Sequence, residues 1–374
     1  MSARFLHTAD WHLGKPFNQI PGDAGARLRE ARFEAVARIA TLARERQVDA
    51  VLVAGDVFDD NLVAEKTLAR ALAAMRGFVG LWIVIPGNHD AALAESAWTR
   101  LARLETSKNI RLALTAEPIT AEDGRWTVLP SPLVERRTMD DTTIWMNEAP
   151  SRGIRIGLAH GSVERLLPEA AVPTNPIGAD RADRAKLDYL ALGDWHVCRE
   201  VGPRTWYAGT PEPDSWRARD GGRALLVEIA GQGSEPQIEH LEVGRFSWHD
   251  EVLDLTQGDI EVAVDSLMSH LQSKEHALLA LRLVGAVGIA GREAVDGALA
   301  RWAPRLHHLE VDDTQLRLSP EDQDLLGLNI DPLVAAVADR LRVRLASRDE
   351  DEREAAALAL RLLWRETVEA ERGR

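Results

Sequence analysis

The 374-residue sequence lacks features that mark several large classes of protein. It contains one cysteine, Cys198, which excludes an intrachain disulfide and indicates a reducing compartment. No apolar run approaches the roughly 20 residues that a membrane-spanning helix needs. The N-terminal residues 1–4 lack the apolar core of a signal peptide. We therefore expect a cytoplasmic protein that does not associate with a membrane.

Basic charge is also scarce, since 45 Lys and Arg face 59 Asp and Glu and the formal net charge is −14. This balance excludes a uniformly basic surface that coats DNA, but it does not exclude DNA as a substrate. Contacts with DNA would have to come from a few local basic residues or from a partner. The candidates for phosphate contacts are Lys15, Arg136, Arg137 and Arg199, although each could equally be a solvated surface charge.

Length and hydrophobic patterning predict more than one domain. The first ninety residues alternate strand and helix patterns, with apolar runs at residues 50–54 and 81–85 that are typical of buried strands. Beyond residue 250 a strand–helix–strand pattern without metal-ligand motifs follows, and then two helices. The predicted organisation is a domain over 1–250, a smaller domain over 251–345, and a C-terminal helix over 346–374.

Four short motifs each follow a predicted strand and carry acids, amides or imidazoles. They are Asp10-Trp11-His12, Gly55-Asp56-Val57-Phe58-Asp59, Gly87-Asn88-His89-Asp90 and Gly193-Asp194-Trp195-His196, with a single His160 before the last. Each has an ordinary alternative on its own: a surface pair, a tight turn or a satisfied buried histidine. Together, at the carboxyl ends of strands where an α/β sheet opens, they predict a metal centre.

The residue types fit the hydrolysis of a phosphodiester, for which two divalent cations can activate water, neutralise phosphate charge and stabilise the leaving oxygen. Asp56 is the candidate bridge between the cations. Asp10 and His12 are two residues apart, so on an extended segment both would face one cation. The other candidate ligands are Asn88 and His160 for the second cation, and Asp194 and His196, one for each.

His89 is adjacent to Asn88 and is therefore expected to point away from the ligands. A histidine beside a bound phosphate could protonate the leaving oxygen, and Asp90 or Asp59 could hold its ring. The mixture of imidazole and oxygen ligands suits Mn, Fe or Zn better than Ca or Mg.

This motif set resembles the calcineurin-like metallophosphoesterases over about residues 4–250. More narrowly, the segments His7-Thr8-Ala9-Asp10-Trp11-His12-Leu13-Gly14 and Tyr207-Ala208-Gly209-Thr210-Pro211-Glu212 are similar to the SbcD/YhaO branch, which contains DNA repair nucleases. The resemblance implies an α/β fold: a four-layer α/β/β/α sandwich with a smaller α+β C-terminal capping domain.

The resemblance also implies two divalent metal ions, specifically Mn, and assigns their ligands. The first ion would be held by Asp10, His12, Asp56 and His196. The second would be held by Asp56, Asn88, His160 and Asp194. His89 matches the catalytic histidine, and we place Asp90 beside it as a catalytic residue.

The implied function is a two-metal-dependent DNA phosphodiesterase in DNA repair, acting as a 3′–5′ exonuclease and single-strand endonuclease. An SbcC-type coiled-coil ATPase is the expected partner, and the sequence leaves a homodimer open. The alternatives are a metallophosphoesterase acting on a small phosphodiester, or a metal-stabilised scaffold subunit for the ATPase. The second domain favours a long substrate, because a small one does not need it.

Two features leave the outcome open. The family's last motif is usually Gly-His-x-His, but position 194 is Asp here, which predicts a preference for harder ions and a weaker Lewis acid at the second site. The last helix has Ala356, Leu360, Leu363 and Trp364 on one face. That face is expected either to pack against its own domain or to dock the ATPase coiled coil.

Overall fold

The computed structural model describes residues 2–104, 108–164, 174–218, 221–256, 258–319 and 332–372. The chain divides into two compact units, Met1–Ser247 and Trp248–Arg374. We call them unit 1 and unit 2 and describe each by itself.

Unit 1 contains a first six-stranded sheet with the strand order β14-β13-β1-β2-β3-β4. Strands β1 to β4 are parallel, and β13 pairs with β1 in the antiparallel sense. The bounds of its strands are β1 Ala3–Thr8, β2 Ala50–Ala54, β3 Leu81–Ile85, β4 Ile110–Leu112, β13 Arg223–Ile229 and β14 Gln237–Glu242.

A second six-stranded sheet has the order β11-β12-β10-β7-β6-β5. Its central strands β6, β7, β10 and β12 are parallel. The bounds are β5 Ile119–Thr120, β6 Trp126–Ser131, β7 Ile154–His160, β10 Tyr189–Gly193, β11 Arg199–Gly202 and β12 Thr205–Tyr207. A two-stranded sheet pairs β8 Ser162–Val163 with β9 Pro176–Ile177.

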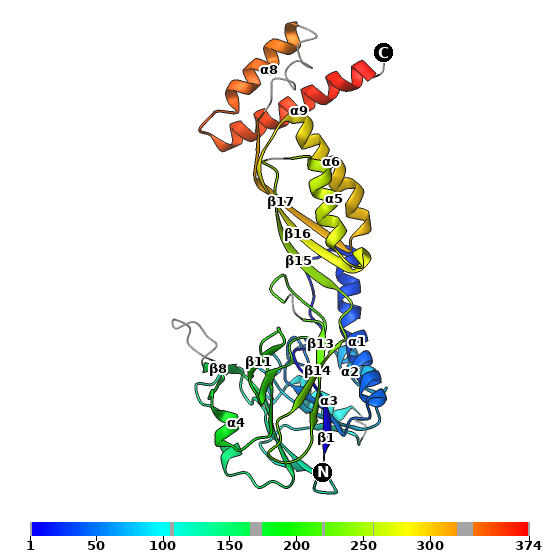
Figure 1. Cartoon of the computed structure of the whole chain (residues 1–374), viewed down its shortest axis with the longest axis vertical. Helices are drawn as coiled ribbons and strands as arrows, with labels where there is room; N and C mark the ends of the chain where they lie inside the picture. The colour runs from blue at the N-terminus through cyan, green and yellow to red at the C-terminus, as the bar shows by residue number, and fades with distance from the viewer. Residues whose placement is uncertain are drawn as a thin grey trace. The chain divides into compact units, whose positions relative to one another are not determined.

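Helices cover the outer faces of both sheets, and Figure 1 shows α1 and α2 beside the first one. Their bounds are α1 Gly22–Glu45, α2 Glu65–Met75, α3 Ala97–Arg103, the 3-10 turn η1 Ile144–Asn147 and α4 Arg181–Arg184. Separate apolar cores lie between the first sheet and its helices, between the two sheets, and on the outer face of the second sheet. The predicted four-layer α/β/β/α sandwich is confirmed.

Strand β2 shows how the sequence produces these layers. All five of its residues are buried. Val51 and Val53 belong to the core under the helices, whereas Leu52 belongs to the core between the sheets. Because side chains alternate along a strand, a continuous apolar run is what a strand buried on both faces requires.

Unit 2 contains a three-stranded sheet with the order β15-β16-β17 and four α-helices among its described residues. The strands are β15 Ser247–Asp254, which begins at the last residue of unit 1, β16 Ala277–Val287 and β17 His308–Leu318. The helices and turns are α5 Ile260–His270, η3 Lys274–His276, α6 Ile289–Trp302, η4 Ala303–Arg305, α8 Pro332–Arg344 and α9 Glu350–Arg372.

Strands β16 and β17 are parallel and α6 connects them, so the predicted strand–helix–strand pattern is present. Helices α5 and α6 share an apolar core with this sheet. The helix predicted from residue 328 is observed from Pro332 onward, and residues 328–331 lie outside the described residues.

The apolar face of α9 packs within unit 2. Leu360 is fully buried beside Ile289 and Ala338, and Leu363 and Trp364 pack against this group. This face is therefore part of a terminal core. Of the helices in the described ranges, none is both long and apolar enough to cross a membrane.

Candidate metal centre

Two loops at the carboxyl ends of β1 and β2 are joined by backbone hydrogen bonds beyond the last paired strand residues. The amide of Asp10 donates to the carbonyl of Gly55 at 3.1 Å, and the amide of His12 donates to the carbonyl of Asp56 at 3.0 Å. These bonds place the side chains of Asp10, His12 and Asp56 around one point. All three residues are almost completely buried.

Glycine is required where these loops approach their neighbours. Gly55 has a φ of +89°, and a Cβ atom there would overlap the His160 ring. A Cβ atom at Gly87 would overlap the Asp56 carboxylate. The close approach predicted for Gly55 is therefore observed, and it allows Asp56 to reach the His160 side of the site.

The loop after β3 brings Asn88, His89 and Asp90. The Asp90 carboxylate is fully buried and accepts hydrogen bonds from the amides of Gly87, at 2.7 Å, and Phe58, at 3.0 Å. Asp90 thus fastens this loop to the loop after β2. The expectation that Asp90 holds the ring of His89 is wrong, because both of its oxygens are committed to backbone amides.

The remaining predicted ligands come from the second sheet. His160 is the last residue of β7, and Asp194 and His196 follow β10, its parallel neighbour. The Asp194 amide donates to Asp10 Oδ1 at 3.1 Å, which joins this loop to the one after β1. The site is therefore built at the edge where both sheets end.

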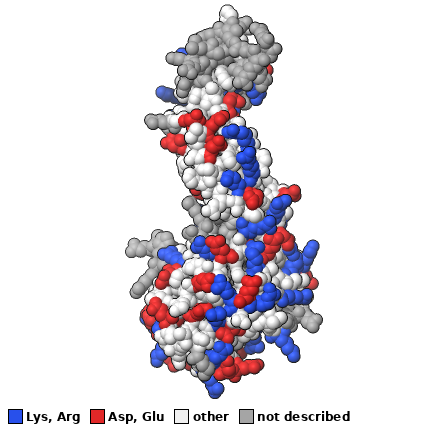
Figure 2. All heavy atoms as spheres, turned by 45° about the vertical axis from the view of Figure 1, so that its right-hand side comes forward, with Lys and Arg blue, Asp and Glu red and all other residues white. Residues whose placement is uncertain are grey.

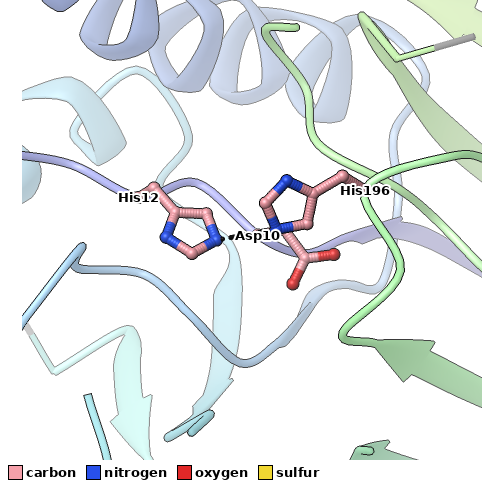
Figure 3. Close-up of side chains that lie close together, drawn as sticks. All are labelled: Asp10, His12 and His196. Atoms are coloured by element: carbon pink, nitrogen blue, oxygen red, sulfur yellow. Dashed lines mark hydrogen bonds between the residues drawn. The ribbon is translucent and has the colours of Figure 1, made fainter. Parts of the chain in front are cut away.

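Asp10, His12 and His196, which we call the first donor group, bring one donor atom each to within 4.8 Å of one another. Figure 3 shows the two imidazoles facing each other beside the Asp10 carboxylate. Their Nε2 atoms are 3.1 Å apart. Two imidazole lone pairs at this distance repel unless a proton or a cation lies beside them, so the arrangement fits a cation ligated by both rings.

Asn88, His160 and Asp194 form the second donor group. His160 Nε2 lies 2.7 Å from Asn88 Oδ1 and 3.9 Å from Asp194 Oδ1. The other ring nitrogen, Nδ1, lies 2.8 Å from the carbonyl of Ala54 and donates to it, which leaves Nε2 as the ligand atom. The second oxygen of Asp194 accepts a hydrogen bond of 2.6 Å from Ser162 Oγ.

Asp56 lies between the two groups. Its Oδ2 atom is 3.6 Å from His12 Nε2 and 3.5 Å from His160 Nε2. Its Oδ1 atom accepts a hydrogen bond of 2.9 Å from the amide of His89. A carboxylate with a donor group on either side has the geometry that a bridging ligand needs.

Charge accumulates at the site. Burial raises the pKa of Asp10 from 3.8 to about 7. Burial alone would lower the pKa of His160, but Asp56, Asp10 and Asp194 outweigh it and raise that pKa to about 9. The pKa of Asp56 lies below its ordinary value despite burial, because His160 and His12 are close. The buried groups therefore stabilise positive charge at this point, as a site for divalent cations requires.

Four of the predicted ligands occupy the left-handed region of backbone conformation. The φ angles are 54° at Asp10, 42° at His12, 50° at Asp56 and 109° at Asp194. The expectation of an extended Asp10–His12 segment is therefore wrong, although both side chains do reach the first donor group. Such angles cost a non-glycine residue on the order of 1–2 kcal/mol each and commonly mark functional sites.

Comparison with known proteins supports the same interpretation. Residues 3–198 match the family description "Calcineurin-like phosphoesterase". The chain belongs to the calcineurin-like phosphoesterase family. It is 26% identical to the uncharacterized metallophosphoesterase YhaO of Bacillus subtilis, over 88% of this chain and 84% of that protein. It is 33% identical to the SbcD component of nuclease SbcCD from Escherichia coli K12, over 64% and 68%.

A DNA double-strand break repair protein Mre11 from Methanosarcina acetivorans is 24% identical over 75% of this chain and 46% of its own length. The relatives of this phosphoesterase thus include a protein without an assigned substrate as well as nucleases and a repair protein. The predicted resemblance to the SbcD/YhaO branch is confirmed.

The sequence analysis missed several residues that hold the site of this phosphoesterase together. Asp214 is buried, and its carboxylate lies 3.1 Å from His196 Nδ1 and 2.5 Å from Lys15 Nζ. Burial alone would raise the pKa of Asp214, but the bond with His196 and the nearby cations hold it well below the ordinary value. Arg32 is also buried and donates to the carbonyls of Trp11, at 2.6 Å, and Asp10, at 3.2 Å.

No motif singled out Asp214 or Arg32, because their contacts join segments about 20 to 180 residues apart. One signal was available. Asp214 follows the segment that carried the family resemblance, and a carboxylate near a ligand histidine is a common support for its ring.

His89 is exposed, in contrast to most of the site. Its Nδ1 lies 2.8 Å from the backbone carbonyl of Asp59, so the ring is held by the backbone of Asp59. It does not point away from the ligands as expected, because one ring nitrogen lies within 4.8 Å of donor atoms of His12 and Asp56. Its ring also meets that of His12 edge to face, with centroids 4.6 Å apart.

The candidate phosphate contacts differ in their surroundings. Lys15 is paired with Asp214, and Arg136 is paired with Asp60 at 2.9 Å. Arg199 lies over the ring of Trp195, next to the ligand loop. Figure 2 shows Lys and Arg interspersed with Asp and Glu on the face that it draws, as expected for a net acidic chain without a uniformly basic coat.

Proposed function

We propose that this phosphoesterase is a two-metal-dependent DNA phosphodiesterase that acts in DNA repair, as an exonuclease and single-strand endonuclease. The observation that carries the proposal is the position of Asp56 Oδ2, which is 3.6 Å from an imidazole of one donor group and 3.5 Å from an imidazole of the other. The nuclease and repair names of the relatives favour DNA over other phosphodiesters.

The residues present fit two divalent cations. Asp10, His12 and His196 would hold the first, Asn88, His160 and Asp194 would hold the second, and Asp56 would contribute to both. When bound, the cations supply charge neutralisation and activation of water. We assign Mn as the natural metal, since two imidazoles in one group and an added carboxylate in the other suit an ion of intermediate hardness.

His89 is the residue that moves a proton. When Nδ1–H donates to the carbonyl of Asp59, the orientation of the ring is fixed and Nε2 is the atom left for the substrate. In the imidazolium form, Nε2–H protonates the leaving oxygen of the scissile phosphodiester. The exposure of His89 makes it reachable by a polymer. Asp90 contributes by holding the His89 loop against the amide of Phe58.

The substrate class is tested with end-labelled single- and double-stranded DNA and with bis(p-nitrophenyl) phosphate, each in Mn²⁺ and in Mg²⁺. Shortening of labelled DNA that disappears in Asp56→Asn supports the proposal. Hydrolysis of the small diester with intact DNA would instead favour the small-substrate alternative. No hydrolysis of either, in a protein that binds both cations, would favour a scaffold subunit.

We also propose an SbcC-type coiled-coil ATPase as the partner, because the relatives named as the SbcD component of nuclease SbcCD belong by that name to a complex. The inner face of α9 is buried, which leaves Leu358, at 57% exposed, and Leu362, at 43%, as the residues available for docking. Deleting residues from 349 onward would also uncover Ile289 and Ala338, so point substitutions are the cleaner test.

The double variant Leu358→Glu with Leu362→Glu is expected to abolish copurification with the ATPase and to leave basal nuclease activity unchanged. Val262→Glu, an equally exposed apolar position on α5, serves as the matched control and is expected to bind normally. Normal binding by the double variant would contradict docking through α9.

A further inference from the structure

A buried network of charges lies behind one imidazole of the first donor group. The side chain of Asp214 is fully buried, and its two oxygens face different partners. Oδ1 lies 3.1 Å from His196 Nδ1, and Oδ2 lies 2.5 Å from Lys15 Nζ. The amide of Lys15 donates to the carbonyl of His12 at 3.1 Å. The network therefore connects the two loops that carry the facing imidazoles.

We propose that Asp214 is a positioning residue that fixes the tautomer and orientation of His196 and so sets the affinity of the first donor group for its cation. The inference rests on the proposed function. By accepting from Nδ1–H, Asp214 leaves the lone pair on Nε2, which faces His12 Nε2 at 3.1 Å. A carboxylate in this position also makes the imidazole more basic and a better ligand.

The surroundings of Asp214 favour a charged carboxylate in one position. A buried carboxylate is costly unless it is paired, and here Lys15 supplies the compensating charge. The backbone two residues earlier is held as well, because Arg32 Nη1 donates to the carbonyl of Glu212 at 3.0 Å. Asp214 therefore has little freedom to turn away from His196.

The other donor group lacks an equivalent among the described residues. The Nδ1–H of His160 donates to the carbonyl of Ala54, which is a neutral acceptor. Asp214 therefore makes the two groups unequal. The cation held by His12 and His196 is expected to bind more tightly than the cation held by His160.

A neighbouring carboxylate provides a matched control. Glu212 is as buried as Asp214, but its oxygens accept from the amides of Arg245 and Phe246, at 2.8 Å each. Glu212 thus anchors backbone and does not touch a predicted ligand in the contacts of the described residues. Replacing it perturbs the same segment without touching His196.

The experiment measures Mn²⁺ binding by isothermal titration and by electron paramagnetic resonance on the full chain. Asp214→Asn is expected to weaken the tighter site by about 10–100-fold and to leave the weaker site unchanged. Glu212→Gln is expected to lower the melting temperature while both affinities stay at the wild-type values. This contrast separates positioning from a general loss of structure.

Two results would overturn the inference. If wild type binds two Mn²⁺ and Asp214→Asn binds both equally well, Asp214 does not position a ligand, and the proposed function still stands. If wild type binds no Mn²⁺, the proposed function fails and the inference fails with it.

A measurement on wild type guards against a variant that does not fold. In Zn²⁺-loaded protein with ¹⁵N-labelled histidine, the Nδ1 proton of His196 is expected at low field and slow to exchange, because Asp214 accepts it. The signal is assigned by its loss in His196→Gln. Rapid exchange of this proton with solvent would refute the inference without any Asp214 variant.

Discussion

The two donor groups share Asp56 but differ in chemistry. The first group combines Asp10 with the imidazoles of His12 and His196, and the carboxylate of Asp214 supports one of these rings. The second group has one imidazole, an amide and an additional carboxylate, together with a hydroxyl from Ser162. Imidazoles favour transition metals, whereas oxygen ligands favour harder ions. One bridging residue thus joins two sites with different demands on the metal.

Both groups also depend on the packing of the two sheets. The first takes Asp10 and His12 from the loop after β1 and His196 from the loop after β10. The second takes Asn88 from the loop after β3 and His160 from β7. Neither group exists unless the apolar core between the sheets has formed. The metal centre is therefore a property of the whole sandwich.

Removing the shared residue is expected to have the largest effect, because it acts on both groups at once. Asp56→Asn should lower DNA cleavage by about 10³-fold or more, since each cation contributes several kcal/mol to the transition state. Metal analysis by mass spectrometry should find fewer than two ions per chain. Cleavage within tenfold of wild type would break the idea of a shared bridge.

Removing the proton donor should spare both groups. His89→Ala is expected to reduce cleavage by about 10²–10⁴-fold while two ions stay bound, since general acid catalysis contributes on that scale. The control is the metal count on the same preparation. A count that falls with activity would make His89 a ligand, consistent with its distance from His12 and Asp56.

Changing one residue of the second group should alter the metal preference without abolishing catalysis. Asp194→His removes a hard ligand and the acceptor of the Ser162 hydroxyl. The ratio of activities with Zn²⁺ and with Mg²⁺ is expected to rise by about tenfold, because an imidazole suits the softer ion. An unchanged ranking of Mn²⁺, Mg²⁺ and Zn²⁺ would remove the proposed difference between the groups.

The smallest expected effect is on the stability of the chelator-treated protein. A group whose pKa is raised by folding stabilises the fold at low pH, and the effect is lost as pH rises through the folded value. Asp10, at about 7 against 3.8 unfolded, loses its contribution between these values, and His160, at about 9 against 6.5, loses its contribution at higher pH. The melting temperature should therefore fall from pH 6 to 9 in EDTA.

The same scan with Mn²⁺ should show a smaller fall, because the cations take the place of the protons. Equal slopes with and without metal would contradict cation binding at these residues.

Much of unit 1 could be predicted from local sequence. The run at β2 is buried on both faces, and the motifs stand where β1, β2, β3 and β10 end. Strand periodicity and the meeting of strand ends are local rules, so they can be read from a single segment. They placed each of the seven predicted ligands at the site.

The rest depends on contacts between distant segments. Local patterns did not tell that the ligands come from two sheets, nor that Asp10 and His12 adopt left-handed angles. The contact of Asp214 with Lys15 spans 199 positions in the sequence and belongs to no motif. The partners of Asp90 are backbone amides, which sequence patterns do not reveal. The packing of α9 was likewise one of two alternatives that its periodicity left equal.

The central claim is that one carboxylate joins two metal sites. It is tested most directly by the electron paramagnetic resonance spectrum of the wild-type chain loaded with Mn²⁺. Two ions bridged by Asp56 should lie about 3.5–4 Å apart and give an exchange-coupled spectrum that is lost in Asp56→Asn. Two equivalents of Mn²⁺ with the spectrum of isolated ions, or a single equivalent, would contradict the account.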